Sequence, residues 1–303
     1  MRITAPIVPL FPIGIKDPNH CEICWIDETK EEPHLWQVAD TNPIADTNQH
    51  QQQQWSQRRQ QQWLRGRAVA KQAVKRLLAR CHGITVDPTA IQLHVDEWGR
   101  PMVVIENALD IHTTIAPPTI SIAHSRSCNG YATIAIAVDS SEQLHVGIDL
   151  ERMRPLETEE TAKEAVEKTV LANIVFSPEE IRFLSNRNNE SFDERFLRLW
   201  CTKEAVSKAI GVGLQGDPHH YLIREYNAST GTSVVICNTS RIRRSHCINH
   251  IRRFSDEPTS DTPISVITTR QNDWIIAIAA VPASVPMPAP SLSLLPLPQP
   301  LRD

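Results

Sequence analysis

Two features are missing from this sequence of 303 residues. It has no apolar run long enough to span a bilayer. It also has no overall positive charge, because 35 acidic residues outnumber 31 basic ones and leave a net charge of −4. These absences argue against a membrane-spanning protein and against general nucleic-acid binding, which usually needs a basic balance. Any site for anions must therefore be local.

The cysteines do not show the pattern of a disulfide framework. There are seven, an odd number, spread between Cys21 and Cys247. Such a set fits a reducing compartment, so we expect a cytoplasmic protein. Cys21-x-x-Cys24 is the one metal-like spacing, but it lacks a second nearby pair or a His-x-x-x-His, and we do not expect zinc there.

The apolar patterning predicts a mixture of strands and helices. Hydrophobic residues make up 41% of the chain and charged residues 22%, as in ordinary globular proteins. Alternation predicts strands at 22–26, 91–95, 102–105, 119–123, 131–138, 146–151, 221–224, 233–237, 264–269 and 274–281. Helical spacing and capping signals predict helices at 55–82, 157–173, from 177 onward and at 192–210. The expected fold class is α+β.

Two similar strands suggest an internal repeat. The segments 132–138 and 275–281 resemble each other, and each closes a run of helix followed by strands. We therefore expect two copies of one α+β unit, at 15–140 and 141–282, after a short extension at 1–14. Seven prolines lie between Pro282 and Pro300, so we expect the tail at 283–303 to be disordered or polyproline-like.

The predicted helix at 192–210 carries a lysine where an apolar side chain is expected. Ser191 and Glu194 form a capping box, and Gly211 supplies a stop. Lys203 lies within an apolar stripe made of Phe196, Leu199, Trp200, Val206 and Ile210. A lysine there either extends its ammonium to water or meets an anion inside, because burying an unpaired charge is prohibitive.

Two carboxylates share one face of the predicted strand at 146–151. Side chains alternate along a strand, so Asp149 and Glu151 point the same way at its end. Mg²⁺ commonly takes one or two carboxylates and completes its shell with water and substrate phosphate. For such a triplet alone, a solvated strand end is the simpler interpretation.

A basic helix is predicted between residues 55 and 82. Its charged residues are all basic: Arg58, Arg59, Arg65, Arg67, Lys71, Lys75, Arg76 and Arg80. Ala70, Val74, Leu77 and Leu78 keep helical spacing, so the helix is amphipathic. Its basic face is either solvated or a site for phosphates.

Two motifs taken together carry a family resemblance: Gly147-Ile148-Asp149-x-Glu151, and Phe196-x-x-x-Trp200-x-x-Lys203-Glu204-Ala205-x-x-Lys208 followed by Gly211-x-Gly213-Leu214. They resemble the signature of the 4'-phosphopantetheinyl transferase superfamily. Residues 55 to 282 are similar to its larger single-chain members, which serve polyketide, nonribosomal peptide and fatty acid synthases. The resemblance implies a pseudo-twofold pair of units with the active site in the cleft between them.

The implied reaction is that of a holo-[acyl-carrier-protein] synthase, in which coenzyme A donates phosphopantetheine to a serine of an apo acyl or peptidyl carrier protein. By resemblance, Asp149, Glu151 and Glu204 hold Mg²⁺ against the pyrophosphate. Glu204 is also the candidate base for the carrier serine, directly or through a water. Lys203 and Lys208 stabilise charge on the α-phosphate and on the departing 3',5'-ADP. Lys203 should then meet an anionic ligand or a metal-site carboxylate.

The resemblance also assigns coenzyme contacts to the first unit. Arg67 follows Gly66 in the basic helix, Arg100 occupies the basic position of a Gly-Lys-Pro turn, and His124 contacts the 3'-phosphate or the adenine side. The sequence departs from the family pattern at three places. Gln62 replaces an arginine, for which Arg59 and Arg65 are the candidate substitutes. Ala123 replaces a serine before His124, and Cys201 stands where Ser or Ala is usual.

Two other function classes stay open. One is a non-catalytic module that binds coenzyme A or a carrier protein, and the other is a different Mg²⁺-dependent phosphoryl-transfer enzyme. A single-chain pair supplies internally the interface that a one-unit protein obtains by oligomerising, so we expect a monomer. No motif marks the surface that would meet a carrier.

Overall fold

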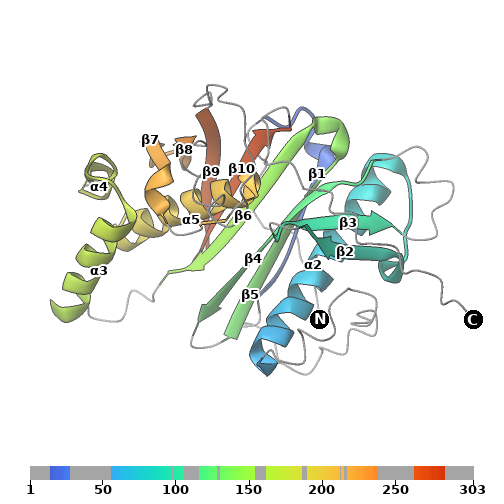
Figure 1. Cartoon of the computed structure of the whole chain (residues 1–303), viewed down its shortest axis with the longest axis horizontal. Coiled ribbons are helices and arrows are strands. Elements are labelled where there is room, and N and C mark those ends of the chain that lie inside the picture. The colour runs from blue at the N-terminus through green and yellow to red at the C-terminus, as the bar shows by residue number, and fades with distance from the viewer. Residues whose placement is uncertain are drawn as a thin grey trace, which may run out of the picture.

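The structure is a computed structural model that describes residues 14–27, 56–96, 99–105, 116–127, 130–153, 162–185, 190–211, 213–214, 217–237 and 263–283. It confirms the expected α+β mixture of helices and strands (Figure 1). The glutamine-rich segment before 56, the proline-rich tail after 283 and most of the extension at 1–14 lie outside these ranges.

In chain order the elements are β1 (Cys21–Asp27), α2 (Gln57–His82), β2 (Ile91–Val95), β3 (Pro101–Ile105), β4 (Thr119–Ser127), β5 (Gly130–Val138), β6 (Leu144–Arg152), α3 (Ala162–Val175), α4 (Pro178–Ser185), α5 (Phe192–Ile210), β7 (Tyr221–Asn227), β8 (Thr232–Cys237), β9 (Pro263–Gln271) and β10 (Trp274–Pro282).

The strands form three antiparallel sheets. One has the order β1-β5-β4, a second has the order β6-β10-β9-β8-β7, and β2 pairs with β3 in a hairpin. Helix α2 packs on the first sheet and α5 on the second (Figure 1). A central hydrophobic cluster draws residues from β1, β4, β5, β6 and β10, so it joins the inner faces of both sheets.

Hydroxyl side chains of β4 bridge the first sheet to β6. Thr119 donates to the carbonyl of Leu144 at 2.9 Å, and the hydroxyl of Ser121 accepts from the backbone N–H of Ile148 at 3.1 Å. Ser125 donates to Oε2 of Glu151 at 2.8 Å. These three residues point to one side of β4, since side chains alternate along a strand. The two sheets are therefore joined by specific polar bonds as well as by apolar packing.

The predicted alternation in β6 is confirmed. Val146, Ile148 and Leu150 belong to the central cluster, whereas Gly147 faces α5. A Cβ on Gly147 would lie 1.8 Å from the carbonyl oxygen of Ala205, so only glycine lets the strand approach the helix this closely. This close contact brings Asp149 next to the middle of α5.

Several expected boundaries were wrong; the strand predicted at 221–224, for example, continues to Asn227. The strand predicted at 119–123 continues to Ser127, because its backbone pairing with β5 runs on until Ser127 meets Gly130. His124 and Ser125 therefore lie inside a strand, not after its end. The helix expected at 157–173 is described from Ala162 and ends at Val175, while 157–161 lie outside the described residues.

The two cysteines of the metal-like spacing lie on opposite faces of β1. Cys21 belongs to the central cluster and Cys24 to the cluster beneath α2, as three-residue spacing in a strand requires. The two thiols therefore cannot bind one ion. Of the helices in the described ranges, none is both long enough and apolar enough to cross a bilayer.

Candidate functional site

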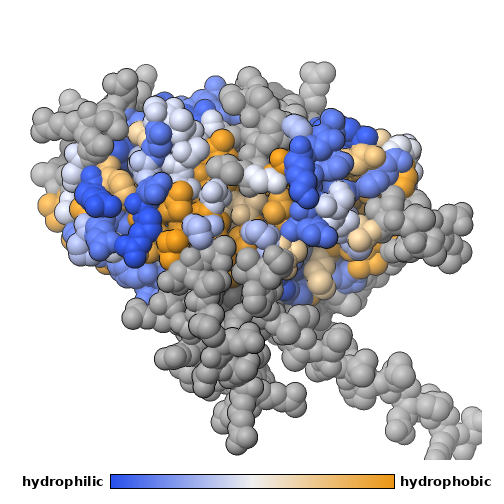
Figure 2. Space-filling model, turned by 90° about the horizontal axis from the view of Figure 1, so that it is seen from above, coloured by the Kyte–Doolittle hydropathy of each residue, from blue (hydrophilic) through white to orange (hydrophobic). Residues whose placement is uncertain are grey.

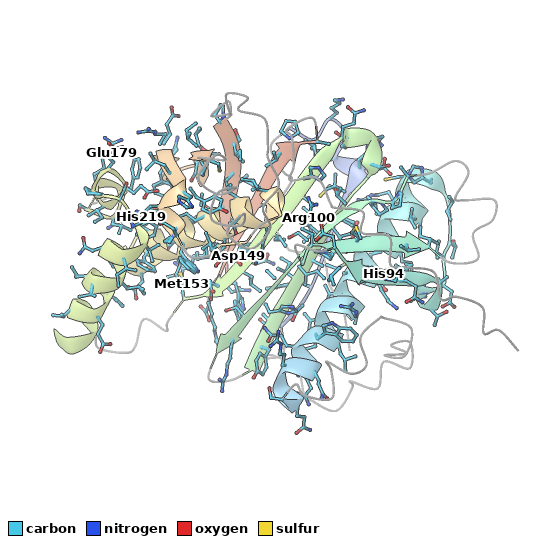
Figure 3. All side chains as sticks on the ribbon, viewed as in Figure 1. His94, Arg100, Asp149, Met153, Glu179 and His219 are labelled. Atoms are coloured by element: carbon cyan, nitrogen blue, oxygen red, sulfur yellow. The ribbon has the colours of Figure 1, made fainter. Side chains whose placement is uncertain are left out.

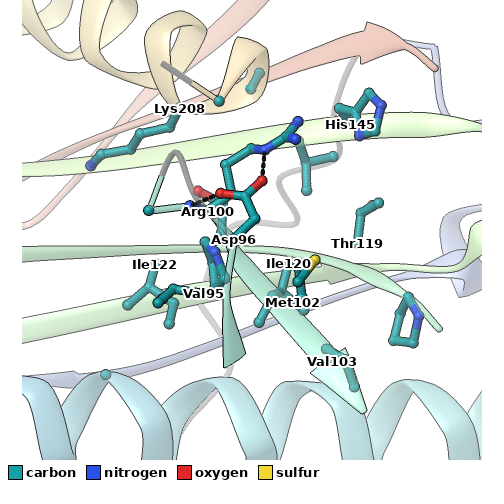
Figure 4. Close-up of a pocket in the computed structure, with 18 of the residues that line it drawn as sticks. Val95, Asp96, Arg100, Met102, Val103, Thr119, Ile120, Ile122, His145 and Lys208 are labelled. Carbon is teal, nitrogen blue, oxygen red and sulfur yellow. Dashed lines mark hydrogen bonds and ion pairs between the residues drawn. The ribbon is translucent and has the colours of Figure 1, made fainter. Parts of the chain in front are cut away.

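A cavity of about 710 Å³ is lined by residues on both sides of the β5–β6 connection in the sequence. Its walls come from α2, the β2–β3 hairpin and β4 on one side, and from β6 and the end of α5 on the other (Figure 4). Four of the predicted coenzyme contacts line it: Arg67, Arg100, His124 and Lys208. In Figure 3, Arg100 and Asp149 both lie near the centre of the molecule.

One face of the molecule is not uniformly polar. Figure 2 shows hydrophobic residues gathered toward the middle of the face seen from above, with hydrophilic residues on both sides. The cavity itself is lined by apolar side chains as well as basic ones, among them Val95, Met102, Ile120 and Ile122. A ligand with both an apolar body and anionic groups fits such a lining.

Arg100 is held in the cavity by the hairpin and by the end of α5. Its Nε donates to Asp96 at 2.6 Å, and its backbone N–H donates to the same carboxylate at 2.9 Å. A Cβ on Gly211 would lie 2.1 Å from Cδ of Arg100, and Gly211 has the left-handed φ of 87° that ends α5. The terminal nitrogens of Arg100 have no hydrogen-bond partner within the described ranges, so they can bind an anion.

Arg67 joins α2 to the hairpin. Its Nη2 donates to the carbonyl of Leu93 at 2.9 Å, and its guanidinium lies 3.7 Å from the centre of the Trp63 ring. These contacts fix the guanidinium on the cavity wall. Of the two proposed substitutes for the arginine missing at Gln62, Arg59 is exposed, whereas Arg65 is buried and close enough to His124 to affect its pKa.

His124 packs directly against α2. Its Nδ1 lies 3.0 Å from the hydroxyl of Thr133. Burial, with Lys208 and Arg65 nearby, lowers the pKa of His124 to about 4. The ring is therefore neutral at neutral pH in the ligand-free protein. Ala123 lies in the central cluster, facing away from His124.

Gly66 provides the space for the His124 ring, which gives the first local prediction. A Cβ at Gly66 would lie 2.7 Å from Cε1 and 3.0 Å from Nε2 of His124. Gly66→Ala should displace the ring and destabilise the protein by about 1 to 3 kcal/mol. We expect weaker coenzyme A binding in calorimetry. In a Gly66→Ala/His124→Ala double variant the clash is gone, so stability should recover; if it does not, His124 is not the neighbour that matters.

Asp149 is the centre of the carboxylate group. It is buried, and its Oδ1 accepts from Nζ of Lys208 at 2.7 Å. Lys208 also donates to the carbonyl of Ile148 at 3.1 Å. The second oxygen, Oδ2, is buried and accepts no hydrogen bond of good geometry from the described part of the chain, although the thiol of Cys201 lies close to the carboxylate. Such an atom is costly unless something binds it.

The two glutamates near Asp149 are affected by its charge. Burial and Asp149 raise the pKa of Glu151 to about 7, although the bond from Ser125 acts in the opposite direction. Burial and Asp149 also raise the pKa of Glu204. Burial alone would lower the pKa of Lys208, but Asp149 and Glu204 outweigh burial and raise it. The site therefore holds more negative charge than its one lysine offsets.

These residues fit a divalent cation whose shell the ligand completes. Among the residues that the structure describes, no three His, Cys, Asp or Glu side chains stand close enough together to enclose an ion. The unpartnered Oδ2 of Asp149 and the raised pKa values of Glu151 and Glu204 nevertheless mark a deficit of positive charge. Hard carboxylate oxygens with open positions suit Mg²⁺, which keeps water and phosphate ligands.

Lys203 does not face this site. Its side chain is completely buried, and its ammonium donates to Glu180 Oε2 at 2.9 Å and to the carbonyls of Val175 and Pro218 at 3.1 and 3.0 Å. The expectation that its partner would be an anionic ligand or a metal-site carboxylate is wrong. All three N–H donors of the ammonium are therefore used. They join α5 to the end of α3, the start of α4 and the segment at Pro218.

Three partners of the predicted site residues are not predicted by the sequence. Ser177 and Glu180 form a capping box at the start of α4, which accounts for Glu180 locally, but a lysine on a core face also calls for a buried acid. No local pattern predicts that Asp96 binds the guanidinium of Arg100. The strand predicted at 119–123 ends before Ser125, so the hydrogen bond from Ser125 to Glu151 is not expected. Cys201, by contrast, is buried as a small residue should be, and burial with Asp149 nearby raises the pKa of its thiol, which stays protonated.

Comparison with known proteins connects this geometry to a family. Residues 145–279 match the family model of the 4'-phosphopantetheinyl transferase superfamily. The chain is 27% identical over 146 residues to a 4'-phosphopantetheinyl transferase of Bacillus subtilis, covering 48% of this chain and 52% of that protein. It is also 27% identical over 164 residues to an L-aminoadipate-semialdehyde dehydrogenase-phosphopantetheinyl transferase of Schizosaccharomyces pombe, covering 49% and 55%.

The chain thus spans about half the length of the curated relatives that it matches. The segment matched by the family model contains Asp149, Glu151, Glu204 and Lys208. The cavity residues contributed by α2, the hairpin and β4 lie before that segment. The structure brings the two groups together, since Lys208 lines the cavity and also bonds to Asp149.

Proposed function

Since residues 145–279 match the 4'-phosphopantetheinyl transferase superfamily, we propose that the chain transfers the 4'-phosphopantetheine moiety of coenzyme A to a serine of an apo acyl or peptidyl carrier protein. One observation carries the proposal. A single lysine, Lys208, connects a cavity lined by Arg67, Arg100 and His124 with the buried carboxylate of Asp149. Coenzyme A needs both parts, because it carries a 3'-phosphate as well as a pyrophosphate.

In this proposal the carboxylates of Asp149, Glu151 and Glu204 hold Mg²⁺. When bound, the ion would supply positive charge to the pyrophosphate as its phosphoanhydride bond breaks. The protein's own contribution is to keep Oδ2 of Asp149 available while Lys208 occupies Oδ1. Ser125 keeps Glu151 in place from across the join between the sheets.

The transfer step uses groups of this chain at stated atoms. The hydroxyl oxygen of the carrier serine attacks the phosphorus attached to pantetheine, and Glu204 takes its proton directly or through a water. A new serine O–P bond forms, the phosphoanhydride P–O bond breaks, and 3',5'-ADP leaves with the electron pair. Lys208 stabilises the negative charge on that leaving group. Lys203 instead keeps α5 in position, since its donors are all used.

The test is the release of 3',5'-ADP from coenzyme A, measured by chromatography, with and without an apo carrier protein. We expect release only when carrier and Mg²⁺ are both present. Tight coenzyme A binding without any release would favour a non-catalytic binding module. Release at the same rate without a carrier would favour another Mg²⁺-dependent phosphoryl-transfer enzyme.

We further propose that residues 15–140 and 141–282 are a pseudo-twofold pair that acts as a monomer. The sheet order β1-β5-β4 in the first half matches β6-β10-β9 in the second, and a long helix covers each sheet. The first half supplies Arg67, Arg100 and His124, and the second supplies the carboxylates and Lys208.

This architecture predicts that residues 1–140 and 141–283, made as separate chains, are each inactive, because neither holds both groups. The intact chain should show a turnover per chain that does not change on dilution, while light scattering reports a monomer. A chain ending at Ala283 should keep nearly full activity and serves as the control. Activity in either isolated half, or turnover that collapses on dilution, would contradict the architecture.

A further inference from the structure

His145 lines the cavity but takes no part in the transfer mechanism proposed above. It lies near the start of β6, lines the same cavity as Arg100, and is half-buried. Its ring makes no hydrogen bond and no ion pair with any residue that the structure describes. Figure 4 shows the ring of His145 and the guanidinium of Arg100 on the same side of the cavity, whereas Lys208 extends away from both. A titratable ring without a partner in a ligand cavity needs an explanation.

Few donors remain available to an anion at this end of the cavity. Arg67 already gives Nη2 to Leu93, and the charge of Arg100 is partly offset by Asp96. His124 is neutral and has Nδ1 beside Thr133. A phosphate monoester presents three strongly accepting oxygens and up to two negative charges. A further donor that can take up a proton would complete the site.

We propose that His145 is an additional coenzyme-binding residue, which donates a hydrogen bond from β6 to the 3'-phosphate while Arg100 contacts that phosphate from the hairpin. The inference rests on the proposed function, because it needs coenzyme A as the ligand of the cavity. It assigns to the second half of the chain a contact with the 3'-phosphate, which the sequence had assigned only to the first half.

Protonation of His145 on ligand binding would make this contact measurable through its pH dependence. Burial and Arg100 lower the pKa of His145 in the ligand-free protein, so the ring is neutral at neutral pH. A phosphate beside the ring acts in the opposite direction and raises the pKa. Binding should therefore take up a proton, and affinity should rise as pH falls from about 8 to about 6.5. The other charged or titratable groups lining the cavity are Arg67, Asp96 and Arg100, with His124 from β4 and Lys208 from α5.

The experiment is calorimetric titration of the intact protein with coenzyme A and with 3'-dephospho-coenzyme A at both pH values. We expect His145→Ala to weaken coenzyme A by about 10-fold at the lower pH, the loss of one charged hydrogen bond, and to leave the dephospho compound unchanged. The pH dependence that the wild type shows should disappear in the variant. Titration of the ligand's own phosphate cancels, because the same ligand is compared between proteins.

Two further variants keep the outcome interpretable. His145→Gln retains a neutral donor, so it should bind more tightly than His145→Ala but without proton uptake. His94→Ala removes a histidine of β2 that does not line the cavity, and it should behave as the wild type. Thermal melting of each variant verifies folding.

Equal losses for both ligands, or an unchanged pH dependence in His145→Ala, would overturn the role of His145 and leave the proposed function standing. Failure of the wild type to bind coenzyme A at all would instead overturn the proposed function.

Discussion

Replacing Asp149 with Asn is expected to lower the rate of phosphopantetheine transfer by about 10²- to 10³-fold, as the loss of one preorganised charge at a reaction centre typically does. The amide oxygen can still accept from Lys208, so the fold should hold. The position of the unpartnered Oδ2, however, is then taken by the amide nitrogen, a hydrogen-bond donor that cannot hold a cation. The measurement is the initial rate across a Mg²⁺ titration, in which half-saturation should also shift to higher concentration.

A matched control is available on α5. Asp193 pairs with Lys168 at the start of that helix, away from the cavity, and Asp193→Asn should transfer at the wild-type rate. Unchanged turnover in Asp149→Asn would show that Asp149 is not needed for transfer. Full wild-type activity in excess EDTA would show that the cation is not needed.

The second large effect concerns stability. Lys203→Met should destabilise the protein by about 3 to 5 kcal/mol, because it leaves the carboxylate of Glu180 buried and uncompensated. Glu180 has no route to water: its two oxygens accept from the backbone N–H groups of Ile223 and Ser177, both at 2.7 Å. Denaturant unfolding, followed by far-UV circular dichroism, measures the loss.

The matched control removes the second charge as well. In Lys203→Met/Glu180→Gln the amide oxygen can still accept from Ile223, and no buried charge is left, so most of the lost stability should return. The folded fraction of Lys203→Met should transfer at close to the wild-type rate, since its ammonium does not face the cavity. A fully stable but inactive Lys203→Met protein would contradict this and make Lys203 a catalytic residue.

Local patterns predicted the parts of the site that a single element determines. Strand alternation places Asp149 on the face of β6 toward α5, and the capping signals at Ser191 and Gly211 give the limits of α5. Gly66 and Gly147 show the opposite case. Each is small because of a distant neighbour, His124 for one and the backbone at Ala205 for the other. No pattern near either glycine identifies that neighbour.

The sequence did not predict which side chains of different helices and strands contact one another. Lys203 on an apolar stripe does require an anion, but Glu180 is 23 residues away and its capping role already accounted for it locally. Ser125 meets Glu151 only because β4 continues past the predicted end and lies beside β6. Such pairs are fixed by tertiary packing, and periodicity within one element carries no information about them.

The most direct test of the account is the intact mass of apo acyl and peptidyl carrier proteins after incubation with this protein, coenzyme A and Mg²⁺. We expect at least one carrier to gain the mass of a single phosphopantetheine, and we expect the gain to disappear when the acceptor serine is changed to Ala or when EDTA is present. No gain in any carrier of a broad panel, from a folded protein that binds coenzyme A, would contradict it.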